Sequence, residues 1–220
     1  NGSAAIQVYL SRLSSRIGGQ PARYFRWRPM TWSRGPSCGP PPVWDSLAFT
    51  CRVFGLSPKG SQTMAMFTRG CPGKCAFCGA ADTLVRFRSL DNIFKELDDI
   101  AALGIKNLVV NDDTYTSNKK RVLQLSQGII DRKYNFNISV QLRLDQVDKE
   151  ICDAMFESGV KYVGPGIESG NNSIIKQIGK GPKESKDNMR VKIRLLQEYN
   201  WRIRNSYVFG MPGETEKQIL

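Results

Sequence analysis

The regular alternation of strand and helix patterns after residue 60 constrains the fold of this 220-residue chain more than any other feature. Short apolar runs, typical of buried strands, alternate with segments whose apolar residues recur at helical spacing. The predicted strands span residues 63–67, 107–111, 136–142, 162–167 and 203–209. The helices between them have apolar positions within 90–100, 122–129, 147–156 and 189–199, and a further helix begins at 216. This alternation predicts a parallel α/β sheet with right-handed crossovers.

Polar clusters follow all five predicted strands. They comprise the cysteines within 71–78, Asp112 with Asp113, Arg143, Glu168 with Ser169, and Glu214. In a parallel barrel the carboxyl ends of the strands share one face, and active sites lie on that face. Because random polar residues would scatter between both ends, this convergence indicates an enzyme.

Three cysteines lie within eight residues, in the order Cys71-Pro-Gly-Lys-Cys75-Ala-Phe-Cys78. The glycines and the proline favour an open loop over a helix. A loop of this kind can place its thiolates around one soft metal centre. Three thiolates on a four-iron, four-sulfur cluster would leave one iron without a protein ligand. That iron could bind a substrate, so the loop predicts chemistry as well as structure.

Structural zinc and disulfides are the alternatives for this cysteine loop. A structural zinc site needs four ligands, and the chain contains no histidine. The fourth ligand would have to be Cys38, Cys51 or Cys152, none of which lies at a short zinc spacing. Six cysteines in 220 residues are also too few for a dense disulfide framework. The spacing therefore favours an iron–sulfur site over both alternatives.

The overall composition is that of an ordinary globular protein, with 40% hydrophobic and 24% charged residues. No apolar run reaches about 18 residues, so we expect no membrane-spanning helix. The first residues lack a basic region followed by an apolar core, so no signal peptide is expected. Reduced thiols and an oxygen-sensitive cluster would fit the cytoplasm.

The net charge of +12 is concentrated toward the N-terminus. Residues 1–70 hold nine Lys or Arg and one acid, whereas residues 71–220 hold 23 and 19. A basic arm can bind nucleic acid, but scattered arginines more commonly form a solvated surface. Prolines also interrupt residues 1–45 repeatedly. We therefore predict an irregular, basic, Pro-rich segment over 1–60 and a core domain over 61–220, and nucleic-acid binding is weakly supported.

The cysteine loop, with Phe77 just before its third cysteine, resembles the cluster loop of radical S-adenosylmethionine (radical SAM) enzymes. Further landmarks at 86–89, 112–116, 166–170, 178–181 and 210–215 are similar in order and spacing to those of cobalamin-binding members of that superfamily. The resemblance covers residues 63–220. It implies a partial (β/α) barrel of six units, of which about five strands are present and the sixth is missing. Residues 203–209 would then form an exposed sheet edge, because 1–45 are too Pro-rich to replace a strand.

The resemblance also implies two cofactors and the residues that bind them. Cys71, Cys75 and Cys78 would hold a [4Fe-4S] cluster. Contacts with S-adenosylmethionine fall on Phe77, Asp112, Asp113, Arg143, Glu168, Ser169, Gly210 and Glu214. Among these, an aspartate would accept hydrogen bonds from the amino group of the methionine moiety, Arg143 would pair with its carboxylate, and Glu168 would bind ribose hydroxyls. The backbones at Phe77 and Gly210 would approach the adenine, and no residue is assigned a catalytic role.

Simpler roles remain open for several of these residues. The two aspartates could cap the next helix. Arg143 could pair with Asp145, and Glu214 could be a solvated charge at a helix N-terminus. These alternatives require no ligand.

The function implied by the resemblance is reductive cleavage of S-adenosylmethionine to a 5′-deoxyadenosyl radical, for hydrogen abstraction or methyl transfer. An electron donor such as flavodoxin or ferredoxin would be the partner, and cobalamin could bind through a domain outside this chain. The alternatives are a methylthiotransferase-like enzyme acting on RNA or a ribosomal protein, and a non-catalytic metal- or nucleic-acid-binding protein. The substrate is not identified by any motif.

Overall fold

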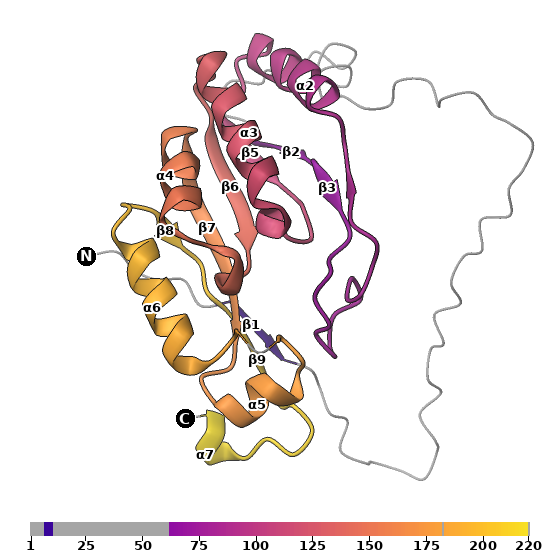
Figure 1. Cartoon of the computed structure of the whole chain (residues 1–220), viewed down its shortest axis with the longest axis vertical. Coiled ribbons are helices and arrows are strands. Elements are labelled where there is room, and N and C mark those ends of the chain that lie inside the picture. The colour runs from indigo at the N-terminus through magenta and orange to yellow at the C-terminus, as the bar shows by residue number, and fades with distance from the viewer. Residues whose placement is uncertain (1–6, 11–61, 182, 220) are drawn as a thin grey trace, which may run out of the picture.

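The computed structural model describes residues 7–10, 62–181 and 183–219 (Figure 1). The strands are β1 Gln7–Leu10, β2 Gln62–Ala65, β3 Thr68–Arg69, β4 Arg86–Phe87, β5 Asn107–Val110, β6 Asn137–Leu142, β7 Val160–Glu168, β8 Arg202–Ile203 and β9 Ser206–Phe209. The α-helices are α2 Leu90–Ala102, α3 Lys119–Asp131, α4 Lys149–Glu157, α5 Asn172–Gln177, α6 Lys186–Gln197 and α7 Glu216–Ile219. Two short 3₁₀ helices, η1 Tyr115–Ser117 and η2 Leu144–Gln146, follow β5 and β6.

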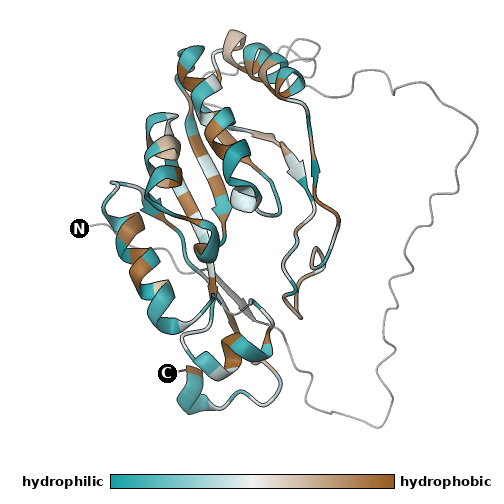
Figure 2. Ribbon diagram, viewed as in Figure 1, coloured by the Kyte–Doolittle hydropathy of each residue, from teal (hydrophilic) through white to brown (hydrophobic). Residues whose placement is uncertain are grey.

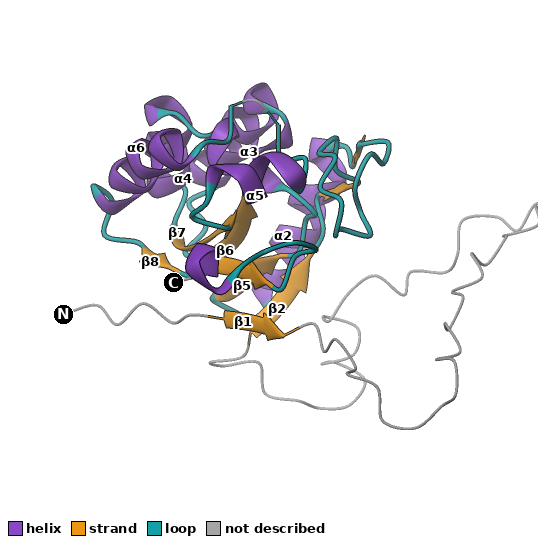
Figure 3. Ribbon diagram, turned by 90° about the horizontal axis from the view of Figure 1, so that it is seen from below, coloured by secondary structure: helices purple, strands orange, loops and turns teal. Residues whose placement is uncertain are grey.

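The main sheet has the strand order β1-β9-β7-β6-β5-β2, with β8 paired to the start of β7. Every pair in this sheet is parallel. Helices α3, α4 and α6 lie over one side of the strands (Figure 3). This is the predicted parallel α/β architecture.

The core lies between the sheet and its covering helices. Strand β6 alternates exposed or half-buried residues with the buried Ile138, Val140 and Leu142. Side chains alternate between the two faces of a strand, so these three point to the same side. Apolar residues are correspondingly frequent along β6 and β7 in Figure 2. Buried residues of the helices, such as Leu97 and Leu125, complete this layer.

The helices begin and end where local chemistry predicts. Side chains of Ser89, Asn118 and Asp148 accept hydrogen bonds from backbone N–H groups in the first turns of α2, α3 and α4. Gly104 and Gly159, the predicted stops, have φ of +73° and +92°. Helix α5 was not predicted, because its six residues are too few to show a helical period.

The fifth predicted strand, 203–209, is wrong in its continuity. The chain instead forms β8 and β9, separated by Arg204 and Asn205. The Arg204 N–H still donates to the Val163 carbonyl at 2.9 Å. The register along β7 also shifts between Gly166 and Glu168, where β9 pairs. Strands β8 and β9 therefore pair with β7 as two short ladders, not as one continuous strand.

The predicted exposed edge at residues 203–209 is also wrong. Strand β1 pairs in parallel with β9, from Gln7 opposite Ser206 to Leu10 opposite Phe209. Four residues of the Pro-rich segment are enough for this pairing, because the prolines begin only at Pro21. The free edges within the described part of the sheet are therefore β1 and β2. The proposed domain boundary at residue 60 falls outside the described residues and stays a prediction.

Deleting residues 1–10 should speed amide exchange in β9 at least about tenfold, because its outer N–H and C=O groups lose their partner strand. Strand β5, which lies between β6 and β2, should keep its protection and serves as the internal control. Hydrogen exchange with peptide-level mass spectrometry measures both strands at once. Unchanged exchange at Ser206–Phe209 after the deletion would show that β1 contributes nothing to the edge.

None of the helices in the described residues is long and apolar enough to cross a membrane.

Candidate active site at the carboxyl ends of the strands

The cysteine loop is closed at its base by a small antiparallel pair of strands. Thr68 and Arg69 of β3 pair with Phe87 and Arg86 of β4, so the loop leaves and returns at one place. Within the loop, the Thr83 N–H donates to the Cys71 carbonyl at 3.0 Å, and the Thr83 hydroxyl accepts from the Cys71 N–H at 2.9 Å. The loop is therefore tied together by its own backbone next to its first cysteine.

Gly70 makes the turn into the cysteine loop. Its φ is +93°, a conformation that residues with a side chain rarely adopt. A Cβ at this position would also collide with the Leu84 carbonyl oxygen. Both the turn and the close approach therefore require glycine directly before Cys71.

The loop also docks on the segment that follows α5. The Ala76 N–H donates to the Ile178 carbonyl at 2.8 Å. A Cβ at Gly179, whose φ is +74°, would lie only 2.8 Å from the Lys74 carbonyl oxygen. The motif at 178–181, noted in the sequence without a role, thus supplies a close backbone contact for the cysteine loop.

Cys71, Cys75 and Cys78 are all free thiols, and so is Cys152 in α4. A disulfide among these four is therefore not the role of the loop. Cys78 is exposed, and Cys71 and Cys75 are half-buried. Burial raises the pKa of the Cys75 thiol, and the nearby Arg143 and Lys180 act against that rise. Cys38 and Cys51 lie outside the described residues.

The donor set, three free thiols on one loop, fits an iron–sulfur cluster. In the described part of the chain, no three Cys, Asp or Glu side chains are gathered closely enough to hold one ion. A zinc site requires its ligands to converge on one atom. In a cluster, by contrast, each thiolate binds a different iron, so the three sulfurs stay apart. Three unpaired thiols on one exposed loop are consistent with that arrangement.

The two aspartates after β5 hold the start of the cysteine loop. One carboxylate oxygen of buried Asp112 accepts from the backbone N–H groups of Phe67 and Thr68, at 2.7 and 3.0 Å. This bonding explains why β2 ends at Ala65, short of the predicted Phe67. Burial raises the pKa of Asp112. Asp113 is exposed and accepts from the Gly70 N–H at 2.7 Å.

The alternative role of Asp112 and Asp113 as helix caps is wrong. The following helix, α3, is capped by Asn118, whose side chain accepts from the Arg121 N–H at 3.0 Å. The aspartates instead accept hydrogen bonds from backbone N–H groups that follow β2, the strand paired with β5. Of the two, Asp113 keeps an exposed carboxylate and is the better placed to meet a ligand.

Arg143, at the end of β6, joins the cysteine loop to the neighbouring strands. Its guanidinium forms two hydrogen bonds with Asp145, at 3.0 and 2.9 Å, as the simpler alternative proposed. It also donates to the Lys180 carbonyl at 2.6 Å and lies 3.7 Å from the Cys75 sulfur. Burial alone would lower the pKa of Arg143, but the bonds with Asp145 raise it. Its predicted pairing with a ligand carboxylate stays a prediction.

Glu168 lies at the end of β7 in a left-handed conformation, with φ of +66°. Non-glycine residues adopt this conformation at a cost, and such strain is found at functional sites. The carboxylate is 3.7 Å from the Lys180 ammonium, and burial raises the pKa of Glu168. The adjacent Ser169 is buried, and its hydroxyl accepts from the Asn171 N–H at 3.1 Å.

Lys180 and Glu184 belong to the site, and the sequence did not assign a role to either. The Lys180 side chain is 2% exposed and donates to the Gly166 carbonyl. The Glu184 side chain is fully buried, 3.8 Å from both Lys180 and Arg143, and both its oxygens lack a hydrogen bond. Burial raises the pKa of Glu184. The only sequence signal was the motif at 178–181, since Lys and Glu in a loop are usually solvated.

In the described part of the chain, Gly210, Glu214 and Phe77 form no hydrogen bond or ion pair with the charged group around Lys180. One oxygen of Glu214 accepts from the N–H groups of Gly210 and Met211, at 2.6 and 3.1 Å. Glu214 thus closes the turn after β9 and is more than a solvated charge. Gly210 has a φ of +82°, and Phe77 is 43% exposed on the cysteine loop. The predicted approach of the Phe77 and Gly210 backbones to adenine stays a prediction.

Comparison with known proteins agrees with the fold and the cysteine loop. The family model of the radical SAM superfamily matches residues 66–220. The chain therefore belongs to the radical SAM superfamily.

Individual relatives narrow this assignment only in part. The chain is 30% identical over 162 residues to an uncharacterized methyltransferase of Pyrococcus horikoshii, covering 71% of this chain and 34% of that protein. It is 28% identical over 162 residues to the ribosomal protein uS12 methylthiotransferase RimO of Thermotoga maritima, covering 68% and 37%. It thus spans about a third of the length of these relatives.

A solved structure supports the same fold. The radical SAM methyltransferase TsrM of Kitasatospora setae, with cobalamin and a [4Fe-4S] cluster bound, has a TM-score of 0.65. The match covers 72% of this chain and 33% of TsrM, at 20% identity. At that identity the likeness extends to the fold alone.

Proposed function

We propose that this chain is the core of an enzyme that binds a [4Fe-4S] cluster and S-adenosylmethionine and cleaves the latter reductively. The observation that supports this most strongly is the single exposed loop with three free thiols, docked against Arg143 at the carboxyl ends of the strands. When bound, the cluster would supply the electron that generates a 5′-deoxyadenosyl radical. An external electron donor such as flavodoxin or ferredoxin is part of the proposal.

The residues of this chain have separable tasks in the proposal. Cys71, Cys75 and Cys78 hold the cluster. Arg143 and Lys180 place two positive charges next to Cys75, and such charges favour a thiolate over a thiol. Glu168, held by Lys180, presents a carboxylate toward ribose hydroxyls at the end of β7.

Asp113 is the proposed acceptor for the amino group of the methionine moiety. Its carboxylate is exposed and is fixed by the Gly70 N–H directly before the first cysteine. Asp112 is buried and already accepts two backbone hydrogen bonds, so its role is to hold the loop. Of the two aspartates that the resemblance left open, the contacts thus favour Asp113 for ligand binding.

Methyl transfer and methylthio transfer are the reactions favoured by the relatives' names. The similar proteins include an uncharacterized methyltransferase and RimO, a methylthiotransferase of a ribosomal protein. TsrM is a methyltransferase whose structure contains cobalamin. We therefore include cobalamin, bound by another part of the full-length protein, as a second cofactor of the methyl-transfer variant of this proposal.

Asp113→Asn and Glu168→Gln should each weaken S-adenosylmethionine binding about tenfold or more, because each removes a charged hydrogen-bond acceptor. Titration of the anaerobically reconstituted chain, followed by its electron paramagnetic resonance spectrum, measures the affinity. The matched control is Asp131→Asn, an exposed aspartate at the end of α3. Unchanged affinity in both site variants, with the cluster intact, would assign these acids to structure only.

A further inference from the structure

Two arginines face each other across the strand pair that closes the cysteine loop. Arg69 of β3 is the direct partner of Arg86 in β4, and both residues are exposed. Directly opposed residues of an antiparallel pair project from the same face, where like charges repel. This arrangement is unfavourable for folding unless an anion compensates the two charges.

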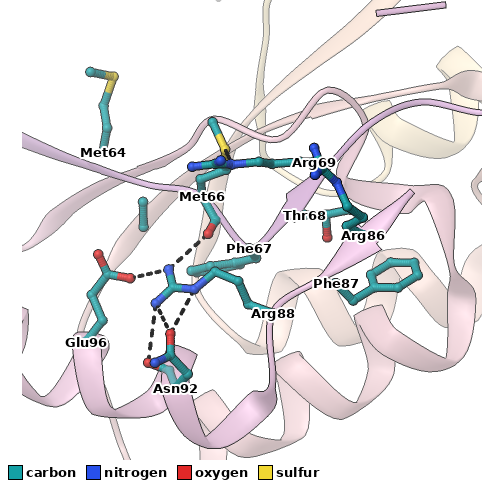
Figure 4. Close-up of a pocket in the computed structure, with 11 residues that line it drawn as sticks. Met64, Met66, Phe67, Thr68, Arg69, Arg86, Phe87, Arg88, Asn92 and Glu96 are labelled. Carbon is teal, nitrogen blue, oxygen red and sulfur yellow. Dashed lines mark hydrogen bonds and ion pairs between the residues drawn. The ribbon is translucent and has the colours of Figure 1, made fainter. Parts of the chain in front are cut away.

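Neither arginine has an acidic partner among the described residues. The only side-chain hydrogen bond of Arg69 is to the Met66 sulfur, at 3.1 Å, and Arg86 forms none in the described part of the chain. Arg88, two residues further along, differs sharply. Its guanidinium pairs with Glu96 at 2.5 Å and also donates to the Met66 carbonyl (Figure 4). Of the three arginines in this part of the chain, only Arg88 is thus paired with an acid among the described residues.

Both arginines line the same two cavities next to the strand pair. The first, of about 410 Å³, extends along β2 to the paired Arg88 and Glu96 (Figure 4). The second, of about 450 Å³, extends along the cysteine loop to the exposed Asp113. Because both cavities are also lined by Met66, they meet at the two arginines.

Exposed apolar side chains surround this cationic centre. Met64 is 66% exposed and Phe87 43% exposed in the first cavity, and Leu84 is 81% exposed in the second. These side chains offer a bound molecule apolar surface beside the two charges. The combination of two unpaired guanidinium groups and an apolar rim matches a molecule with an anionic group on an apolar body.

We propose that Arg69 and Arg86 bind the carboxylate or phosphate of a small substrate, whose apolar body rests on Phe87 or Leu84. The planar guanidinium matches both kinds of anion, which makes them one ligand chemistry. This inference rests on the proposed function, because it names the substrate class of that enzyme. The first cavity, the more enclosed of the two, favours a small molecule over the flat contact of an acidic partner protein.

The test uses 1-naphthaleneacetate as the probe and neutral 1-naphthaleneacetamide as its matched control. Binding is measured by calorimetry at low salt, with and without the cluster. The acid should bind the native chain about tenfold or more tightly than the amide, a preference that Arg69→Gln or Arg86→Gln should abolish. Lys106→Gln, an exposed cation at the other end of β5, should leave it unchanged. Inorganic phosphate should compete if phosphate esters are accepted, and fail to compete if the site takes only carboxylates.

Conservative variants separate binding from folding. Arg69→Lys and Arg86→Lys keep the charge but lose the planar fork, so they should retain part of the preference for the acid. Thermal unfolding of each variant, compared with the native chain, shows whether the fold is intact. A Gln variant that unfolds is replaced in the comparison by its Lys counterpart.

Three results would overturn the inference. The first is equal binding of acid and amide by the native chain. The second is loss of S-adenosylmethionine affinity in parallel with loss of probe binding, which would show that the arginines bind the carboxylate of S-adenosylmethionine itself. The third is binding of an acidic ferredoxin, but not of the probe, through both arginines. Failure of the cluster to assemble, with probe binding retained by the iron-free chain, would refute the proposed function and leave this site standing.

Discussion

Replacing Cys71, Cys75 or Cys78 by alanine should abolish iron loading. Each thiolate would bind a different iron, and the described residues offer no fourth Cys or His nearby to take over. Anaerobic reconstitution followed by iron and sulfide analysis measures the effect directly. We expect the native chain to take up about four irons and each variant to retain almost none.

The remaining cysteines provide the controls for this experiment. Cys152 is buried in α4, where burial raises the pKa of its thiol to about 12. A thiol of that kind is a poor metal ligand at neutral pH, so Cys152→Ala should load iron normally. Cys38→Ala and Cys51→Ala should do the same. Iron loss in any of these three variants would mean that the ligand set is misassigned.

Lys180→Met should destabilise the folded chain by about 3–5 kcal/mol, because it leaves the buried carboxylate of Glu184 and the half-buried carboxylate of Glu168 without their shared cation. Urea unfolding of the iron-free chain measures this loss. Lys106→Met, on the surface, should change the stability by less than about 0.5 kcal/mol. The two lysine variants differ in burial, which is the property under test.

A second substitution tests whether the loss comes from the unpaired charge. Adding Glu184→Gln to Lys180→Met removes one of the stranded carboxylates, so the double variant should recover part of the lost stability. A double variant that is simply the sum of two independent losses would show that Lys180 acts through packing alone. The ion pairs of Lys180 with Glu168 and Glu184 would then contribute nothing to the stability of the site.

The sequence predicted the architecture well because strands and helices here have clear periods. The strands near 107–111 and 136–142 are β5 and β6 within one residue at each end. Short elements were less predictable. Helix α5 has too few residues for a period, and the division of 203–209 into β8 and β9 depends on pairing along β7. The pairing of β1 with β9 links residues about 200 positions apart, which no local pattern reveals.

The candidate site was predicted in outline but not in its internal bonding. The spacing of the cysteines and the polar residues after each strand located the correct face. Sequence position could not separate Asp112 from Asp113, because only their burial and hydrogen bonds distinguish the two. Lys180 and Glu184 were missed for a similar reason. A lysine and a glutamate in a loop look solvated until the fold buries them together.

The electron paramagnetic resonance spectrum of the dithionite-reduced, reconstituted chain tests the central claim most directly. With three cysteine ligands and one iron open to solvent, the chain should show the signal of a reduced [4Fe-4S] cluster, and S-adenosylmethionine should shift that signal. The shift should be weaker in Asp113→Asn at the same ligand concentration. A colourless zinc protein, or a cluster signal that S-adenosylmethionine leaves unchanged, would contradict the account.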